Sequence, residues 1–192
     1  MIFERLEIED LILITPQAYE DYRGIFFESF NQQKFNSAHD QSIIDQLDSV
    51  NFVQDNIATS IKKNTIRGMH FQISKPQAKF VTCIKGSILD VVVDIRPDSK
   101  TFRDWISIVL DDQRYQQLFV PKGFAHGYKS ISNDAIVMYK ADEYYFKEDY
   151  QGIAWDDDEL KIDWEISPSK DEIIVSEQDK SWAGISSFEN RL

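Results

Sequence analysis

Two histidines and a tyrosine are the residues of this 192-residue sequence best suited to proton transfer. His70 lies in the segment Ile66–Gln72, His126 follows Pro121-Lys122-Gly123-Phe124-Ala125, and Tyr139 lies in an apolar run. An imidazole titrates near neutrality and can act as a general base, whereas a phenol stays protonated there and can donate a proton. Each residue also has an ordinary structural explanation as a hydrogen-bonded core side chain. By themselves these residues leave both explanations open.

The segment around His70 has the alternation of a β-strand, in which successive side chains point to opposite faces. One face carries Ile66, Gly68, His70 and Gln72, and the other carries Arg67, Met69 and Phe71. The first face is the more polar one. In a barrel, a polar inward face lines a pocket, so we expect His70 to face a pocket.

Most of the chain reads as short strands, because Val- and Ile-rich runs are separated by Gly, Asp, Asn and Pro. The predicted strands include Val81–Ile84, Ile88–Ile95, Trp105–Leu110, Gln116–Val120, Gly127–Ile131 and Ala135–Ala141. The run SILDVVVDIR is nearly continuous in apolar residues, which is typical of a strand buried on both faces. We expect a short helix at Asn31–Ser37, a loop from there to about Val50, and a mainly β sandwich or barrel.

Length and composition favour a single domain over residues 1–192, with a tail of short helical pieces from about residue 167 packing on the barrel. The net charge of −12 argues against a nucleic-acid partner. A local cluster of Arg and Lys remains compatible with a diphosphate ligand. No apolar run has the length of a membrane span, and the first residues do not resemble a secretory signal. The single cysteine, Cys83, favours a reducing, cytoplasmic compartment.

The spacing Pro121, Gly123, His126 matches the pattern P-x-G-x-x-H. It resembles the second motif of the cupin superfamily, and this resemblance implies a jelly-roll β-barrel. Metal-dependent cupins combine that histidine with an H-x-H pair, which this sequence lacks. Counting ligands therefore disfavours a metal, although a metal-dependent cupin oxygenase remains an alternative that bound iron or manganese would reveal.

Six short sequence segments, which follow one another in the same order as in a known family, carry a more specific resemblance. The segments are Asp21–Phe30, Phe52–Asn56, Ile66–Gln72, Asp90–Arg96, Pro121–Gly127 and Tyr139-Lys140. From about Ile12 to Asp179 the chain resembles the dTDP-4-dehydrorhamnose 3,5-epimerases. The resemblance implies a cofactor-independent isomerase that is a homodimer, whose N-terminal segment crosses to the partner subunit.

The resemblance also implies residue roles. His70 matches the catalytic base, Tyr139 the catalytic acid, and Asp179 the carboxylate paired with the base. Tyr144 matches an aromatic residue that stacks near the nucleotide base. The other matches to substrate-contacting positions are Arg23, Glu28, Gln54, Asn56, Arg67, Lys79 and His126.

Four positions depart from the family pattern. Ile57 replaces a histidine and Ala78 replaces a glycine. Gln178 replaces a lysine and Tyr150 replaces a glutamate, and the resemblance places these two positions at the edge of the nucleotide site, where they bear on the identity of the nucleotide or sugar.

The function that the resemblance implies is epimerisation at carbons 3 and 5 of dTDP-4-dehydro-6-deoxy-D-glucose to dTDP-4-dehydro-L-rhamnose, in dTDP-L-rhamnose biosynthesis. A ketone at carbon 4 acidifies the neighbouring C–H bonds, so a base on one face of the ring and an acid on the other suffice. Two alternatives remain open. One is a carbon-3-only epimerase of a related nucleotide 4-keto sugar, and the other is a cupin that binds a sugar nucleotide without catalysis.

Overall fold

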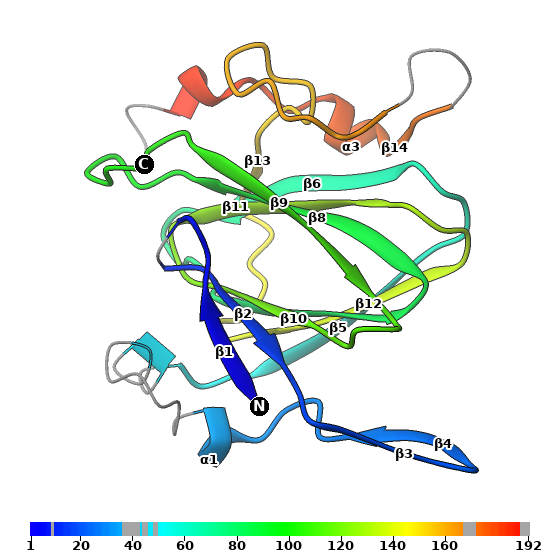
Figure 1. The fold of residues 1–192 in the computed structure, drawn as a ribbon. Coiled ribbons are helices and arrows are strands. Elements are labelled where there is room, and N and C mark those ends of the chain that lie inside the picture. Colours follow the sequence, from blue (N-terminus) through cyan, green and yellow to red (C-terminus); the bar gives the residue numbers. More distant parts are fainter. Residues whose placement is uncertain (9, 36–42, 44–45, 48–49, 167–171, 189–192) are drawn as a thin grey trace.

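The chain folds mainly into β-strands that form two facing sheets (Figure 1). This computed structural model describes residues 1–8, 10–35, 43, 46–47, 50–166 and 172–188. Within that part of the chain, no helix is both long and apolar enough to cross a membrane. The predicted mainly β fold with a few short helices is confirmed.

The first sheet runs in the order β1-β2-β10-β7-β12-β5, with antiparallel neighbours. Its strands are β1 (Ile2–Arg5), β2 (Ile12–Thr15), β10 (Gln117–Val120), β7 (Lys79–Lys85), β12 (Ala135–Ala141) and β5 (Gln54–Ser60). The second sheet runs in the order β13-β6-β11-β8-β9, and β14 pairs with β6 in parallel. Its strands are β13 (Tyr150–Gly152), β6 (Thr65–Gln72), β11 (Phe124–Ser130), β8 (Ser87–Asp94), β9 (Trp105–Asp111) and β14 (Ile174–Val175).

Between β6 and β12 the chain passes repeatedly from one sheet to the other, as in a jelly roll, except at β8 and β9, which pair within the second sheet. The remaining elements lie at the periphery. A hairpin of β3 (Ala18–Asp21) and β4 (Gly24–Phe27) extends away from the barrel (Figure 1). The helices whose bounds lie within the described residues are α1 (Gln32–Phe35), α3 (Glu177–Lys180) and a 3₁₀ helix, η1 (Ile185–Phe188). The C-terminal elements lie against the second sheet, where α3 and β14 flank β6 (Figure 1).

Apolar side chains fill the space between the sheets and also cover the outer face of the second sheet. Ile88 and Val92 of β8 belong to the inner cluster, whereas Val91 and Val93 belong to the outer one. The outer cluster is completed by C-terminal side chains, including Leu160, Trp164, Ile185 and Phe188. This packing confirms that β8 is buried on both faces and explains its unbroken apolar sequence.

A third cluster covers the outer face of the first sheet and corrects one prediction. The chain around Ile43 and Leu47 was expected to be a loop, but Ile43, Gln46 and Leu47 are helical. Ile43 and Leu47 are one helical turn apart, and both are buried in the cluster that contains Phe35. Residues 36–37 of the predicted helix and His39 lie outside the described residues.

Strand β6 does not alternate strictly, which corrects a second prediction. Its pairing with β11 matches His126 to His70 and Tyr128 to Arg67, so the register shifts at this point. Gly68 lies there with a φ of 128°, and a Cβ on it would lie 2.5 Å from the Cα of Gly127. The irregularity brings Arg67 onto the cavity side together with His70, although simple alternation places them on opposite faces.

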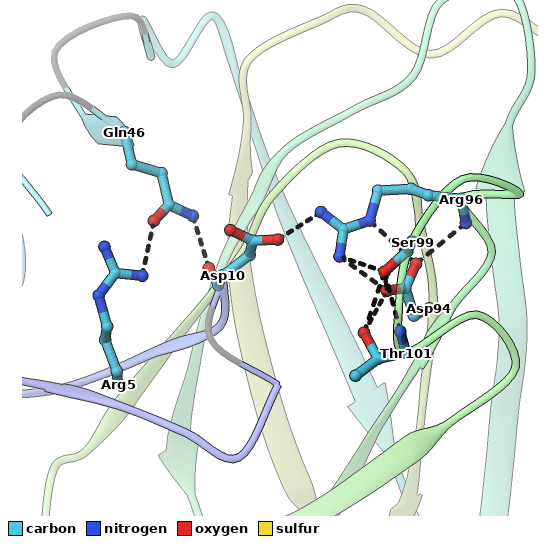
Figure 2. Close-up of polar contacts among 7 residues, drawn as sticks. All are labelled: Arg5, Asp10, Gln46, Asp94, Arg96, Ser99 and Thr101. Carbon is cyan, nitrogen blue, oxygen red and sulfur yellow. Dashed lines mark hydrogen bonds and ion pairs between the residues drawn. The ribbon is translucent and has the colours of Figure 1, made fainter. Parts of the chain in front are cut away.

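A polar network ties the β1–β2 connection to the connection after β8 (Figure 2). Arg96 donates from Nε to Asp94 Oδ1 at 2.9 Å and from Nη2 to Asp94 Oδ2 at 2.7 Å. Its Nη1 donates to Asp10, whose carbonyl accepts from Gln46. The Asp94 side chain is fully buried, and the hydroxyls of Ser99 and Thr101 also donate to it. Charge-assisted hydrogen bonds of this kind join segments far apart in sequence.

Candidate active site

A cavity of about 390 Å³ opens between the two sheets, beside β6. It brings together six of the residues singled out in the sequence, which are Arg67, His70, Lys79, His126, Tyr139 and Asp179. They come from β6, β7, β11, β12 and α3, so the fold gathers them from positions more than 100 residues apart. Other lining residues include Tyr128, Tyr150 and Ser176.

His70 is hydrogen-bonded to Asp179 inside this cavity. The distance from His70 Nε2 to Asp179 Oδ1 is 2.6 Å, and the exposed fractions of the two side chains are 19% and 7%. An ionised carboxylate only accepts hydrogen bonds, so Nε2 carries the proton of the neutral ring. The unprotonated Nδ1 is then the basic atom of His70.

Burial and its neighbours keep His70 neutral. Burial lowers the pKa of His70 below its ordinary value, and the nearby Lys79 and His126 act in the same direction. The hydrogen bond and charge of Asp179 oppose this effect. Burial raises the pKa of Asp179, but the hydrogen bond from His70 and its other hydrogen bonds outweigh burial and lower it overall. Asp179 is therefore ionised and can stabilise the imidazolium that forms when His70 accepts a proton.

Tyr139 faces the same cavity from the opposite sheet. It lies in the middle of β12, where it pairs with Val81 of β7 and Asn56 of β5. Burial raises the pKa of its phenol. The hydroxyl therefore keeps its proton at neutral pH and can serve as a proton donor.

Lys79 brings an ammonium group into the cavity. Burial lowers the pKa of Lys79 to about 8. Its Nζ is 3.5 Å from the carbonyl oxygen of His70. A cation in such a buried place can stabilise negative charge that develops on a bound ligand.

His126 is held by a carboxylate that sequence reasoning did not assign to the site. Its Nε2 lies 3.0 and 2.9 Å from the two carboxylate oxygens of Asp90, which is fully buried. Asp90 interrupts the otherwise apolar run SILDVVVDIR. A charged residue in such a run has to find a partner, and this was the signal for its role. Within the described residues, no group of three or more His, Cys, Asp or Glu side chains forms an arrangement that could hold a metal ion.

Two aromatic residues next to the His70–Asp179 pair were also missed. The ring of Tyr150 is 5.0 Å from the ring of His70, and Trp182 Nε1 donates to Asp179 Oδ1 at 3.2 Å. The sequence identified Tyr150 only as a departure from the family pattern, and it gave no prediction for Trp182. Their sequence positions have no periodic signal that separates them from ordinary core aromatics.

The other predicted site residues do not line the cavity within the described part of the chain. Arg23 lies at the turn of the β3–β4 hairpin and forms an ion pair with Asp21. Glu28 pairs with Lys34, just beyond the same hairpin. Tyr144 is 57% exposed.

Gln54 and Asn56 lie on β5, beside the strand that carries Tyr139. Gln54 Nε2 donates to Asn56 Oδ1 at 2.9 Å. The Nδ2 of Asn56 is buried and has no hydrogen-bond partner among the described residues. A buried amide donor of this kind is costly unless a ligand or water accepts from it.

The double-sheet barrel, together with an imidazole, a phenol and an ammonium group in one cavity, defines a cupin-like protein equipped for acid–base chemistry. The comparison with protein families gives the particular family. The model of the dTDP-4-dehydrorhamnose 3,5-epimerase family matches residues 5–187. The chain belongs to this family.

Individual relatives agree with this assignment. The dTDP-4-dehydrorhamnose 3,5-epimerase of Methanothermobacter thermautotrophicus is 41% identical over 180 residues, which cover 94% of this chain and 92% of the relative. The enzyme of the same name from Escherichia coli K12 is 42% identical over 177 residues, covering 92% and 90%. The crystal structure of the Legionella pneumophila epimerase in complex with dTDP-4-keto-L-rhamnose superposes with a TM-score of 0.86 at 34% identity, covering 96% of this chain and 92% of that one.

Proposed function

We propose that this protein epimerises carbons 3 and 5 of dTDP-4-dehydro-6-deoxy-D-glucose, which yields dTDP-4-dehydro-L-rhamnose for dTDP-L-rhamnose biosynthesis. The observation that carries the proposal is the placement of His70 and Tyr139 on opposite sheets around one cavity. The family membership and the ligand of the Legionella relative support this substrate class.

The chemistry requires two proton transfers at each carbon. His70 Nδ1 removes the proton from carbon 3 or 5, and the electron pair of the broken C–H bond moves through the new C=C bond onto the carbon-4 oxygen. When the carbonyl re-forms, Tyr139 delivers a proton to the same carbon from the other face, which inverts it. Each well-positioned acid or base typically contributes about 10²–10⁴ in rate.

The remaining residues bind the substrate and stabilise charge. Lys79 donates to the carbon-4 oxygen while that oxygen carries negative charge. Asp90 holds His126 in the wall of the same cavity. Arg67, on the cavity wall, is suited to the diphosphate because a guanidinium offers paired donors to phosphate oxygens. Gln54, Asn56 and Tyr144 complete the nucleotide side of the site. No step requires a redox cofactor or a metal.

A homodimer accounts for the positions of Arg23 and Glu28, which lie away from the cavity. Arg23 lies in the β3–β4 hairpin and Glu28 directly follows it. The hairpin extends from the barrel (Figure 1). Phe26 of this hairpin is 70% exposed, and Ile57 on the outermost strand β5 is 72% exposed. In the proposed dimer the hairpin packs on the partner and delivers Arg23 and Glu28 to the partner's cavity. Exposed apolar residues of this kind mark interaction surfaces.

The direct test is product identification. The purified protein is incubated with dTDP-4-dehydro-6-deoxy-D-glucose, and the product is identified by NMR after chemical reduction of the ketone. The proposal predicts sugars with inverted configuration at both carbons 3 and 5. Inversion at carbon 3 alone would instead establish the carbon-3-only epimerase, and tight binding without turnover would establish a binding protein.

We also propose a cytoplasmic location, in keeping with a buried Cys83 that has no second cysteine to pair with.

A further inference from the structure

Trp182 contacts the carboxylate that holds the base, and we propose that it is a positioning residue that sets how readily the His70–Asp179 pair accepts a proton. The inference rests on the role of His70 in the proposed function. The indole Nε1 of Trp182 donates to Asp179 Oδ1 at 3.2 Å, and the same oxygen accepts from His70 Nε2 at 2.6 Å. Trp182 does not line the cavity, so it acts through Asp179.

Strand β13 fixes the position of the indole. Gly152 of this strand pairs with His70 in the sheet. A Cβ at Gly152 would lie 2.4 Å from Trp182 Nε1 and 2.5 Å from Cε2, so the indole occupies the space that a side chain would need. The ring of Tyr150, two residues earlier, meets the Trp182 ring edge-on at 6.1 Å. The strand that packs beside the base therefore also cradles the indole.

Tyr150 completes this arrangement on the imidazole side. Its ring lies 5.0 Å from the His70 ring at an interplanar angle of 41°. The two aromatic residues therefore restrain both partners of the pair, one through ring contact with the imidazole and the other through a hydrogen bond to the carboxylate.

The indole hydrogen bond has a definite electrostatic effect. A carboxylate that accepts a second hydrogen bond holds its negative charge more stably, so it attracts the proton of a neighbouring imidazolium less strongly. Trp182 therefore favours neutral His70, the form that acts as a base.

The other groups around His70 set the background for this effect. Lys79 on β7 and His126 on β11 disfavour the imidazolium, whereas Asp179 on α3 favours it. Arg67, Tyr139 and Tyr150 line the same cavity. Asp179 is thus the group through which a change at Trp182 reaches His70.

The decisive variant is Trp182→Phe, which keeps an aromatic ring and removes the N–H donor. The midpoint of the His70 titration, followed by NMR of the imidazole nitrogens in the free protein, should move to higher pH by about half a unit, the scale expected for one weak hydrogen bond to a charged group. The acid limb of kcat/KM should move by the same amount, while the plateau rate changes little. Trp105→Phe is the matched control, because its indole donates to the Leu160 carbonyl at 2.9 Å, far from the pair in the fold.

A second variant covers the case in which Trp182→Phe does not fold. Gly152→Ala places a methyl group against the indole and should shift the His70 midpoint in the same direction. A folded Trp182→Phe protein, or failing that a folded Gly152→Ala protein, with an unshifted midpoint overturns the inference. A purely structural role would lower the melting temperature and leave the midpoint in place. Because the titration needs no substrate, a wild-type protein without turnover refutes the proposed function and leaves this test intact.

Discussion

His70 Nε2 lies 2.6 Å from Asp179 Oδ1, although the two residues are 109 positions apart in the chain. Strand β14 makes this contact possible, since it pairs in parallel with β6 and matches Val175 to Ile66. Ser176 then caps α3, accepting a hydrogen bond from the backbone N–H of Asp179 at 3.0 Å. The short C-terminal elements therefore bring a carboxylate to the base on the barrel.

Replacement of the proposed acid should separate the two proton transfers. Tyr139→Phe keeps the ring in β12 and removes the hydroxyl, while His70 can still deprotonate the substrate. We expect epimerised product to fall by about 10²-fold or more, whereas exchange of substrate protons with solvent continues. NMR in deuterated water measures both. Equal loss of exchange and product formation would show that Tyr139 also takes part in deprotonation.

The pH dependence of activity follows from the lowered pKa values of His70 and Lys79. The pKa of His70 is lowered below 6.5 mainly by burial, so the base stays neutral, and kcat/KM should fall only at a pH below that value. Lys79 stabilises negative charge on the substrate oxygen best as a cation, and burial lowers its pKa to about 8, so activity should fall as the pH rises through about 8. Lys79→Gln should remove the basic limb and reduce kcat by about 10²–10³. A basic limb that survives in Lys79→Gln would assign it to another group.

Mixing two inactive variants tests the proposed exchange of hairpins between subunits. His70→Asn lacks the base and Arg23→Ala lacks a guanidinium that we propose also contacts the substrate's diphosphate, so each homodimer should have low activity. In a mixed dimer, one cavity combines intact His70 with the partner's Arg23, and activity should return to about a quarter of the wild-type value after random reassortment, because half of the dimers are mixed and each has one complete site. Unrestored activity in dimers shown to have exchanged subunits would place Arg23 in its own chain's cavity.

Loss of the buried Asp94 carboxylate (Figure 2) should destabilise the barrel without changing the catalytic residues. Burial raises the pKa of Asp94, but hydrogen bonds from Arg96 and neighbouring groups outweigh it and lower the pKa below 3.8. Its contribution to stability is therefore present at neutral pH and is lost as acid protonates it. Asp94→Asn should lower the free energy of unfolding by about 3 kcal/mol. Denaturant unfolding measures this effect, and Asp98→Asn, an exposed position, serves as the control.

Much of the fold and the centre of the site could be predicted because the relevant signals are local. Strands such as Ala135–Ala141 have a continuous β-forming sequence, and the observed β12 has the same bounds. The motif around His126 marks the barrel, yet its strand β11 begins at Phe124, three residues before the predicted start. Propensity is weak at strand ends, and pairing with the neighbouring strand β8 decides the boundary.

The rest depends on contacts that no local pattern contains. Arg67 reaches the cavity because β6 is irregular at Gly68, and alternation alone cannot predict such a bulge. Asp90 meets His126 across neighbouring strands, and Asp179 meets His70 only after the C-terminal segment packs on the barrel. The helical residues around Leu47 are stabilised by burial against Phe35, so packing outweighs a weak local preference.

The central claim is that His70 removes the protons next to the substrate ketone. The most direct measurement incubates dTDP-4-dehydro-6-deoxy-D-glucose in deuterated water with the wild type or with His70→Asn, and follows deuterium at carbons 3 and 5 by NMR. The account predicts incorporation at both carbons with the wild type and a rate about 10²–10⁴ lower with the folded variant. Incorporation by His70→Asn at the wild-type rate would contradict it.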